Sequence, residues 1–182
     1  MKTLGILGSL RKDSLNRKLL NAVVKLAPEG MEVEIYDRLG KFPIFNDDLT
    51  HNPPEVVKEF KQKVRGVDAL LFVSPEYNYS IPGGLKNAID WGSRPPRDNC
   101  FDGKPAAIMG VAGRLGGTMR MQYHLRQVMV TLNMYPINKE LFVREGALKF
   151  DAAGTLRDEP TRKAVEEELA ALKVWTEKLS KQ

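Results

Sequence analysis

Short apolar runs alternate with amphipathic segments along the whole chain. The apolar runs carry hydrophobic side chains at successive positions, which is typical of strands that are buried on both faces of a sheet. Their alternation with helical segments is the pattern of parallel βαβ units. We therefore predict an α/β fold with a five-stranded parallel sheet and helices on both faces. The expected strands are residues 3–8, 31–36, 69–74, 105–111 and 137–142.

The amphipathic segments have apolar stripes with the spacing of one helix face. Helix-start signals mark two of them: we expect Asn52 before Pro53 to cap the second helix, and Asp158 with Pro160 to open the last one. The stripes expected to face the core are Leu15, Leu19 and Val23; Val56, Phe60 and Val64; Leu125, Val128 and Leu132; and Val165, Leu169 and Leu172.

Composition narrows the class of protein. A chain of 182 residues fits one domain, which we assign to residues 1–182. The net charge is +5, but basic residues are interleaved with acidic ones, so we expect anionic small molecules as ligands and no nucleic acid. The apolar runs are shorter than the roughly 20 residues that span a bilayer, and no signal pattern is seen at the N-terminus. We expect no membrane association and a cytoplasmic location.

Metal and disulfide chemistry is not expected. Cys100 is the only cysteine, so no intrachain disulfide or thiolate cluster can form. His51 and His124 are isolated from other residues at metal-ligand spacing. We predict no metal site.

The loop after the first strand has the composition of an anion-binding site. Ligands of doubly wound sheets bind beyond the carboxyl ends of the strands, and this loop leads there into a helix. Helix N-termini offer free N–H groups and a positive dipole end, to which Ser9, Ser14 and Asn16 add neutral donors and Arg11 a cation. The loop matches neither GxxxxGK[ST] nor GxGxxG. An ordinary capped helix start explains its composition equally well.

The loop after the third strand, residues 74–84, is rigid and aromatic. Pro75 and Pro82 fix the backbone, and Tyr77 and Tyr79 offer flat surfaces. A planar heterocycle such as a flavin ring would fit such a loop. Alternatively, the tyrosines only cover the end of the sheet.

Together these loops resemble the NADPH-dependent FMN reductase family, which includes bacterial quinone, chromate and azo-dye reductases. The similarity extends through residues 74–91, Gly116, Gly117 and residues 122–127. It implies a flavodoxin-like fold, with the FMN phosphate at the first loop and the isoalloxazine ring along the second. The expected cofactor-binding residues are Ser9, Arg11, Ser14, Leu15, Asn16, Pro75, Glu76, Tyr77, Asn78, Tyr79, Ser80, Ala112 and Gly113.

By the same resemblance, residues 110–117 close the other side of the flavin ring. Related sequences often carry serines where this chain has Val111 and Ala112, so backbone groups must replace their hydrogen bonds. Glycines make such a close backbone approach possible. For Gly116 and Gly117, close packing of the next helix against the sheet is an equally good explanation.

The resemblance also implies the reaction. NADPH or NADH reduces FMN and leaves, and a small acceptor then takes two electrons, so no protein nucleophile is needed and we predict no catalytic side chain. The acceptor stays open among quinones, free flavin, chromate and azo compounds, and so does the choice of nicotinamide. Arg94 is a candidate for the NADPH phosphates, although it could also be an ordinary surface arginine.

Methionines near the fourth helix, Met119, Met121, Met129 and Met134, suggest either core packing or a subunit interface. Because helices of this region pack between subunits in the family, we expect a homodimer or homotetramer.

Two other functions are compatible with an FMN-binding chain. A flavodoxin-type electron carrier is the first, but flavodoxins usually have a threonine-rich phosphate loop and an acidic surface, unlike this chain. A non-catalytic redox-sensing protein is the second.

Overall fold

The computed structural model describes residues 1–113 and 116–181. Short 3-10 helices at Leu39–Lys41, Asp47–Leu49 and Gly146–Leu148 lie in the connections between longer elements. Those elements are β1 (Lys2–Leu7), α1 (Leu15–Leu26), β2 (Glu32–Tyr36), α2 (Glu55–Arg65), β3 (Ala69–Val73), α3 (Gly83–Gly92), β4 (Pro105–Val111), α4 (Met119–Thr131), β5 (Tyr135–Pro136), β6 (Leu141–Val143) and α5 (Glu159–Leu179).

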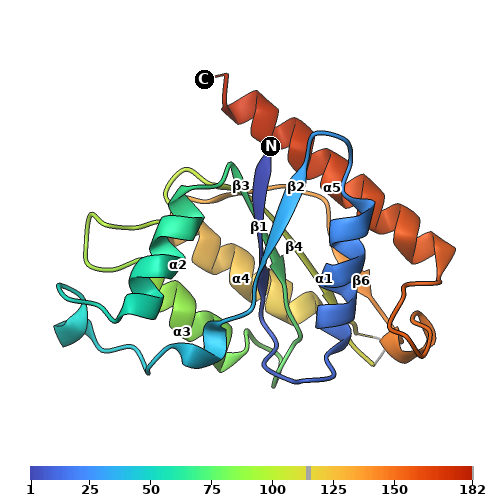
Figure 1. Cartoon of the computed structure of the whole chain (residues 1–182), viewed down its shortest axis with the longest axis horizontal. Helices are drawn as coiled ribbons and strands as arrows, with labels where there is room; N and C mark the ends of the chain where they lie inside the picture. The colour runs from blue at the N-terminus through green and yellow to red at the C-terminus, as the bar shows by residue number, and fades with distance from the viewer. Residues whose placement is uncertain (114–115, 182) are drawn as a thin grey trace.

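The strands form one parallel sheet in the order β2-β1-β3-β4-β5, and β6 also pairs with β4. Helices α1 and α5 cover one face of this sheet, and α2, α3 and α4 cover the other (Figure 1). This is the doubly wound order of flavodoxin-like folds, and the predicted α/β class is confirmed. The order in which strands are added to the sheet reverses between β1 and β3. The carboxyl ends of these two strands therefore border the crevice where such folds bind ligands.

Alternate residues of the central strands supply two hydrophobic cores. Leu70 and Phe72 of β3 pack with Phe60 of α2 on one face. Leu71 and Val73 pack on the other face with α1 and α5. Burial on both faces explains why this strand is an uninterrupted apolar run.

The fifth strand is not continuous, contrary to the prediction for residues 137–142. β5 and β6 pair with β4 on either side of a bulge, in which residues 137–140 lie opposite residues 107–108 of β4. Arg126 of α4 compensates for the lost sheet bonds by donating to the carbonyls of Ile137 (2.8 Å) and Lys139 (3.0 Å). The polar residues after Ile137 thus leave the sheet without leaving these carbonyls unpaired.

Helix boundaries agree with the sequence signals in one of two cases. Asp158 caps α5 as predicted, accepting a hydrogen bond from the Thr161 N–H. The Asn52 prediction is wrong, because α2 starts at Glu55 and its N-cap is Pro54. The proline ring carries no hydrogen-bond acceptor, so it cannot cap the helix. The buried stripe of α2 accordingly includes Val57 instead of Val56.

The methionines of the α4 region belong mostly to the protomer's own core. Met121, Met129 and Met134 are all buried in the cluster that joins α4 to the sheet. They therefore give no support for a subunit interface.

Candidate functional site

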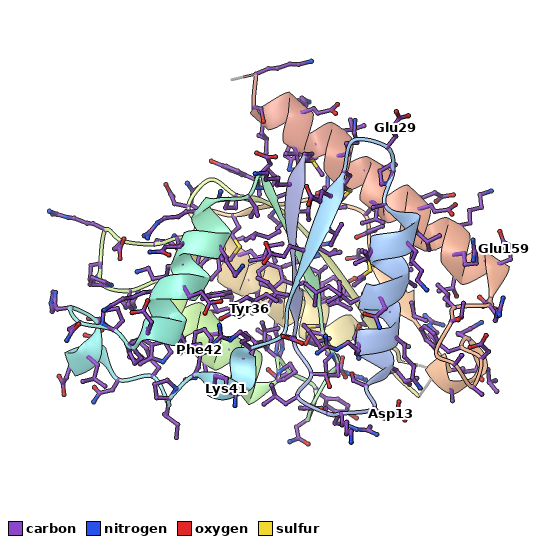
Figure 2. The ribbon with its side chains drawn as sticks, viewed as in Figure 1. Asp13, Glu29, Tyr36, Lys41, Phe42 and Glu159 are labelled. Carbon is purple, nitrogen blue, oxygen red and sulfur yellow. The ribbon has the colours of Figure 1, made fainter. Side chains whose placement is uncertain are left out.

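The loops after β1, β3 and β4 meet at one edge of the sheet. The Gly8 N–H donates to the Val73 carbonyl at 2.9 Å, and the Ser74 N–H donates to the Met109 carbonyl at 3.1 Å, so each loop leaves its strand beside the next. Figure 2 shows Asp13 of the first loop at the same end of the molecule as Lys41 and Phe42, which follow β2; Glu29 lies at the opposite end. The loops chosen from the sequence are thus neighbours in space.

The first loop combines a capped helix start with free donors. Ser14 is the N-cap of α1, and its Oγ accepts from the Arg17 N–H at 3.4 Å. Ser9 Oγ accepts from the Arg11 N–H at 3.3 Å. Both serines are buried, whereas the Arg11 side chain is exposed and can reach an anion from the solvent side. The two explanations of this loop are compatible, since a capped helix still has open N–H groups in its first turn.

Asn16 has a different role from a simple phosphate donor. It is 3% exposed, its Nδ2 donates to the Val111 carbonyl at 2.9 Å, and its Oδ1 accepts from the Val111 N–H at 3.0 Å. The amide therefore ties the start of α1 to the end of β4. Leu15, next to it, is half-buried and also lies beside the loop that follows β6.

The loop after β3 is a tight hairpin. Tyr77 and Ser80 exchange two backbone hydrogen bonds, of 3.1 and 2.9 Å, across Asn78 and Tyr79. Both turn residues have positive φ, +50° and +65°, which asparagine tolerates and which is strained for tyrosine. Tyr77 and Tyr79 are 44% and 65% exposed, so they do not merely cover the end of the sheet.

Residues of α4, which the sequence analysis did not assign to the site, hold this hairpin in place. The Glu76 carboxylate accepts from the Met121 N–H at 3.1 Å and lies 3.5 Å from the Arg120 guanidinium. His124 Nδ1 lies 3.0 Å from Ser80 Oγ. No local motif marked these contacts, because they join segments far apart in the chain.

The loop after β4 is held by backbone hydrogen bonds to the end of β6 and the segment that follows it. The Ala112 N–H donates to the Val143 carbonyl at 3.1 Å, and the Ala112 carbonyl accepts from the Gly146 N–H at 2.9 Å. Gly113 has open space where a Cβ would be, with no described atom within 4 Å. The residue that the sequence analysis missed here is Gly146, whose fit against Val111 leaves no room for a side chain.

Close packing, one of the two explanations for Gly116 and Gly117, applies to only one of these glycines. A Cβ on Gly117 would lie 3.1 Å from Cβ of Phe142, and its φ is +58°, so close packing explains this glycine. Gly116 has no such close neighbour among the described residues. Residues 114 and 115, which belong to the same predicted loop, lie outside the described part of the chain.

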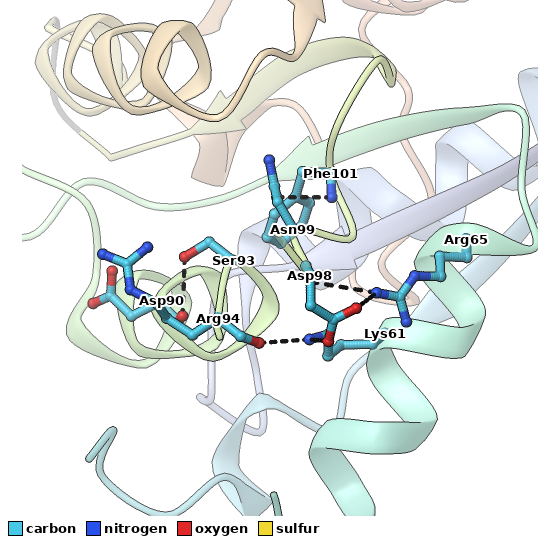
Figure 3. Close-up of polar contacts among 8 residues, drawn as sticks. All are labelled: Lys61, Arg65, Asp90, Ser93, Arg94, Asp98, Asn99 and Phe101. Atoms are coloured by element: carbon cyan, nitrogen blue, oxygen red, sulfur yellow. Dashed lines mark hydrogen bonds and ion pairs between the residues drawn. The ribbon is translucent and has the colours of Figure 1, made fainter. Parts of the chain in front are cut away.

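Arg94 is separated from the other predicted residues. It follows the carboxyl end of α3, whose 10 residues lead away from the hairpin over about 15 Å. Its carbonyl accepts from the buried Lys61 ammonium at 2.5 Å, and Lys61 and Arg65 both pair with Asp98 (Figure 3). Although desolvation acts to raise the pKa of Asp98, these two cations lower it below its ordinary value. The Lys61 cluster thus anchors the loop after α3 and does not join the site.

The described residues include no cluster of potential metal ligands and a single buried thiol. No group of three potential ligands that could hold a metal ion occurs in residues 1–113 and 116–181. Cys100 is buried, and desolvation raises the pKa of its thiol to about 12.

None of the described helices is both long and apolar enough to cross a membrane.

Known proteins are similar to this chain over most of its length. Residues 1–148 match the family model described as NADPH-dependent FMN reductase. An NAD(P)H-dependent FMN reductase of Pseudomonas aeruginosa is 46% identical over 181 residues, covering 98% of this chain and 97% of the relative. An NAD(P)H:quinone oxidoreductase of Solanum tuberosum is 46% identical over 187 residues, covering 98% and 94%. The solved structure of a flavoenzyme NAD(P)H:(acceptor) oxidoreductase from Paracoccus denitrificans superposes with a TM-score of 0.90 at 36% identity, covering 97% of each chain.

Proposed function

Because this chain belongs to the family of NADPH-dependent FMN reductases, we propose that its three adjoining loops bind FMN and present it to NAD(P)H and then to a quinone. The chain is an FMN-dependent NAD(P)H oxidoreductase of small acceptors. The observation that carries the site assignment is that a helix start suited to an anion and an aromatic hairpin meet at the carboxyl ends of β1 and β3. A phosphate and a planar ring are the two parts of FMN that these loops suit.

The first loop is proposed to hold the FMN phosphate. Ser9, Ser14 and the first-turn N–H groups of α1 are neutral donors, and the exposed Arg11 adds a bidentate cation. Leu15 belongs to the same first turn. Asn16 is proposed to act indirectly, by fixing this turn against Val111.

The ring is proposed to lie between the hairpin of residues 75–80 and the backbone of Ala112 and Gly113. The hairpin is rigid, because Pro75 precedes it and two backbone bonds close it. The open space at Gly113 allows a close approach of the ring to the main chain. When bound, FMN supplies the two-electron chemistry, accepting a hydride from the nicotinamide and delivering the electrons to the acceptor. The residues of the chain bind and orient the ring and leave one of its faces accessible.

A quinone is the acceptor we favour, because several relatives at 38–46% identity are named as quinone reductases. The nicotinamide cofactor in the names of the Solanum tuberosum and Arabidopsis thaliana relatives supports the proposed cytoplasmic location. The test is steady-state oxidation of NADPH or NADH by the FMN-loaded protein with benzoquinone. We expect rapid turnover that needs both FMN and the protein. Tight FMN binding without turnover of either nicotinamide would contradict the reductase and favour the electron-carrier alternative.

We further propose a homodimer or homotetramer. Helix α4 exposes Tyr123 and Val130, and the loop after β2 exposes Ile44, so large hydrophobic side chains lie on the surface. Size-exclusion chromatography with light scattering tests the oligomeric state. A monomer at micromolar concentration would contradict this proposal.

A further inference from the structure

The start of α4 is capped by a residue from another loop. Thr118 is the N-cap of α4, but within the described chain its side chain makes no capping bond. Glu76, from the loop after β3, supplies the missing acceptor: its Oε2 accepts from the Met121 N–H at 3.1 Å. A carboxylate at a helix N-terminus is also favoured by the helix dipole. The Glu76 side chain is only 10% exposed, so this interaction is shielded from water.

Arg120 connects the same carboxylate to the tip of the hairpin. One guanidinium nitrogen lies 3.5 Å from Glu76 Oε1. The guanidinium carbon lies 3.9 Å from the centre of the Tyr79 ring, which is the geometry of a cation–π interaction. Arg120 is therefore held between a carboxylate at the base of the hairpin and an aromatic ring at its tip.

Tyr79 needs such support. Its φ of +65° is unfavourable for a bulky side chain, and its ring is largely exposed. The contact between Ser80 Oγ and His124 Nδ1 adds a second attachment of the hairpin to α4. The strained turn is thus fixed by contacts with α4, a helix far from it in the chain.

We propose that Arg120 and Glu76 are positioning residues, which set the orientation of Tyr79 and of the hairpin against the flavin ring. This inference rests on the proposed function, because it needs FMN at the hairpin. Neither side chain is assigned a contact with reacting atoms. Their effect is to hold the hairpin in the one orientation that suits the bound ring.

The test compares FMN binding in the Arg120→Ala and Arg120→Lys variants. The readouts are the Kd for FMN from fluorescence titration, the visible circular dichroism of bound FMN, and the thermal unfolding of the FMN-free protein. Arg157→Ala is the matched control, because Arg157 is an exposed arginine that also pairs with one carboxylate, Asp151, at 2.7 Å.

We expect Arg120→Ala to raise the Kd for FMN about three- to tenfold, because it removes a cation–π contact and an ion pair in which Arg120 is half exposed. The visible dichroism of bound FMN should change, while the melting temperature of the FMN-free protein stays near that of Arg157→Ala. Arg120→Lys keeps the charge but lacks the planar group, so it should rescue only part of the affinity.

A wild-type Kd and dichroism in Arg120→Ala would overturn the inference, and so would a loss of thermal stability with unchanged FMN binding. These outcomes leave the proposed function intact, since the wild-type protein would still bind FMN. Failure of the wild-type protein to bind FMN would instead overturn the proposed function and the inference with it.

Discussion

The side-chain amide of Asn16 forms two hydrogen bonds with the peptide groups of one residue, Val111. Nδ2 donates to its carbonyl at 2.9 Å and Oδ1 accepts from its N–H at 3.0 Å. Both partners are buried. Asn16 thereby fixes the first turn of α1, where we place the FMN phosphate, against the end of β4, where the loop for the other side of the ring begins.

Replacing Asn16 with alanine should destabilise the protein and weaken FMN binding together. The N–H and carbonyl of Val111 would be buried without partners, so we expect the free energy of unfolding to fall by about 2–4 kcal/mol. Urea denaturation of the FMN-free protein measures this change. Asn21→Ala is the control, since Asn21 lies on the exposed face of the same helix. Equal stability of the two variants would contradict the structural role of Asn16.

Arg11→Ala should act on FMN and leave the fold unchanged. A charge-assisted hydrogen bond contributes about 1.5–3 kcal/mol, so the Kd for FMN should rise roughly ten- to a hundredfold. The Arg11 side chain is exposed, and the melting temperature of the FMN-free protein should not move. Lys12→Ala, one residue further along the exposed loop, is the control. An unchanged Kd in Arg11→Ala would refute the phosphate assignment.

Gly146→Ala should disturb the third loop by overpacking. A Cβ at Gly146 would lie 2.2 Å from Val111 Cγ2 and 3.1 Å from Leu15 Cδ1. We expect a loss of about 1–3 kcal/mol in the free energy of unfolding, with weaker FMN binding because Ala112 bonds to Gly146.

Gly83→Ala is the matched control for this substitution. Gly83 lies in the first turn of α3, and a Cβ there would meet no described atom within 4 Å. Alanine should stabilise that helix by up to about 1 kcal/mol. If both glycine variants were equally stable, the close contact at Gly146 would not matter.

The parts of the fold that could be predicted from the sequence are those whose structure depends only on nearby residues. Residues 69–73 are apolar at every position and buried at every position, so a strand covered on both faces follows from the run itself. Asp158 caps its own helix for the same reason. The break between β5 and β6 was not predictable, because it depends on Arg126 reaching the carbonyls of residues 137 and 139 from another element.

The same distinction applies to the site. Proline, tyrosine and serine marked the loops after β1 and β3, because these residue types determine local backbone paths and donors. The contacts of Glu76 with α4 and of Gly146 with Ala112 join distant segments and have no local signal. Asn16 lay in a recognisable motif, but only its burial against Val111 shows which partner its amide has.

Glu168 should make the stability of the protein depend on pH. It is 0% exposed, and neither carboxyl oxygen has a partner among residues 1–113 and 116–181. Desolvation raises its pKa to about 8, against the opposing effect of Arg126 and Lys139, while Glu140 adds to the rise. The Glu168 carboxyl group therefore binds its proton more tightly in the folded state than in the unfolded state, where its pKa is near 4.3.

Protonation of Glu168 stabilises the folded state. This stabilisation is complete below about pH 4.3 and is lost as the pH rises towards about 8. We expect Glu168→Gln to remove a pH-dependent change on the order of 5 kcal/mol in the free energy of unfolding over that range. Urea denaturation at several pH values measures it, with the exposed Glu166→Gln as control. Parallel pH profiles of wild type and Glu168→Gln would contradict this assignment.

The most direct test of the central claim is an anaerobic absorbance spectrum of the FMN-loaded protein, recorded before and after addition of NADPH and then of benzoquinone. We predict that NADPH bleaches the flavin bands and that benzoquinone restores them, with FMN remaining bound throughout. Flavin bands that neither NADPH nor NADH can bleach would contradict a reductase and favour a carrier or sensor. A protein that takes up no FMN would contradict the account as a whole.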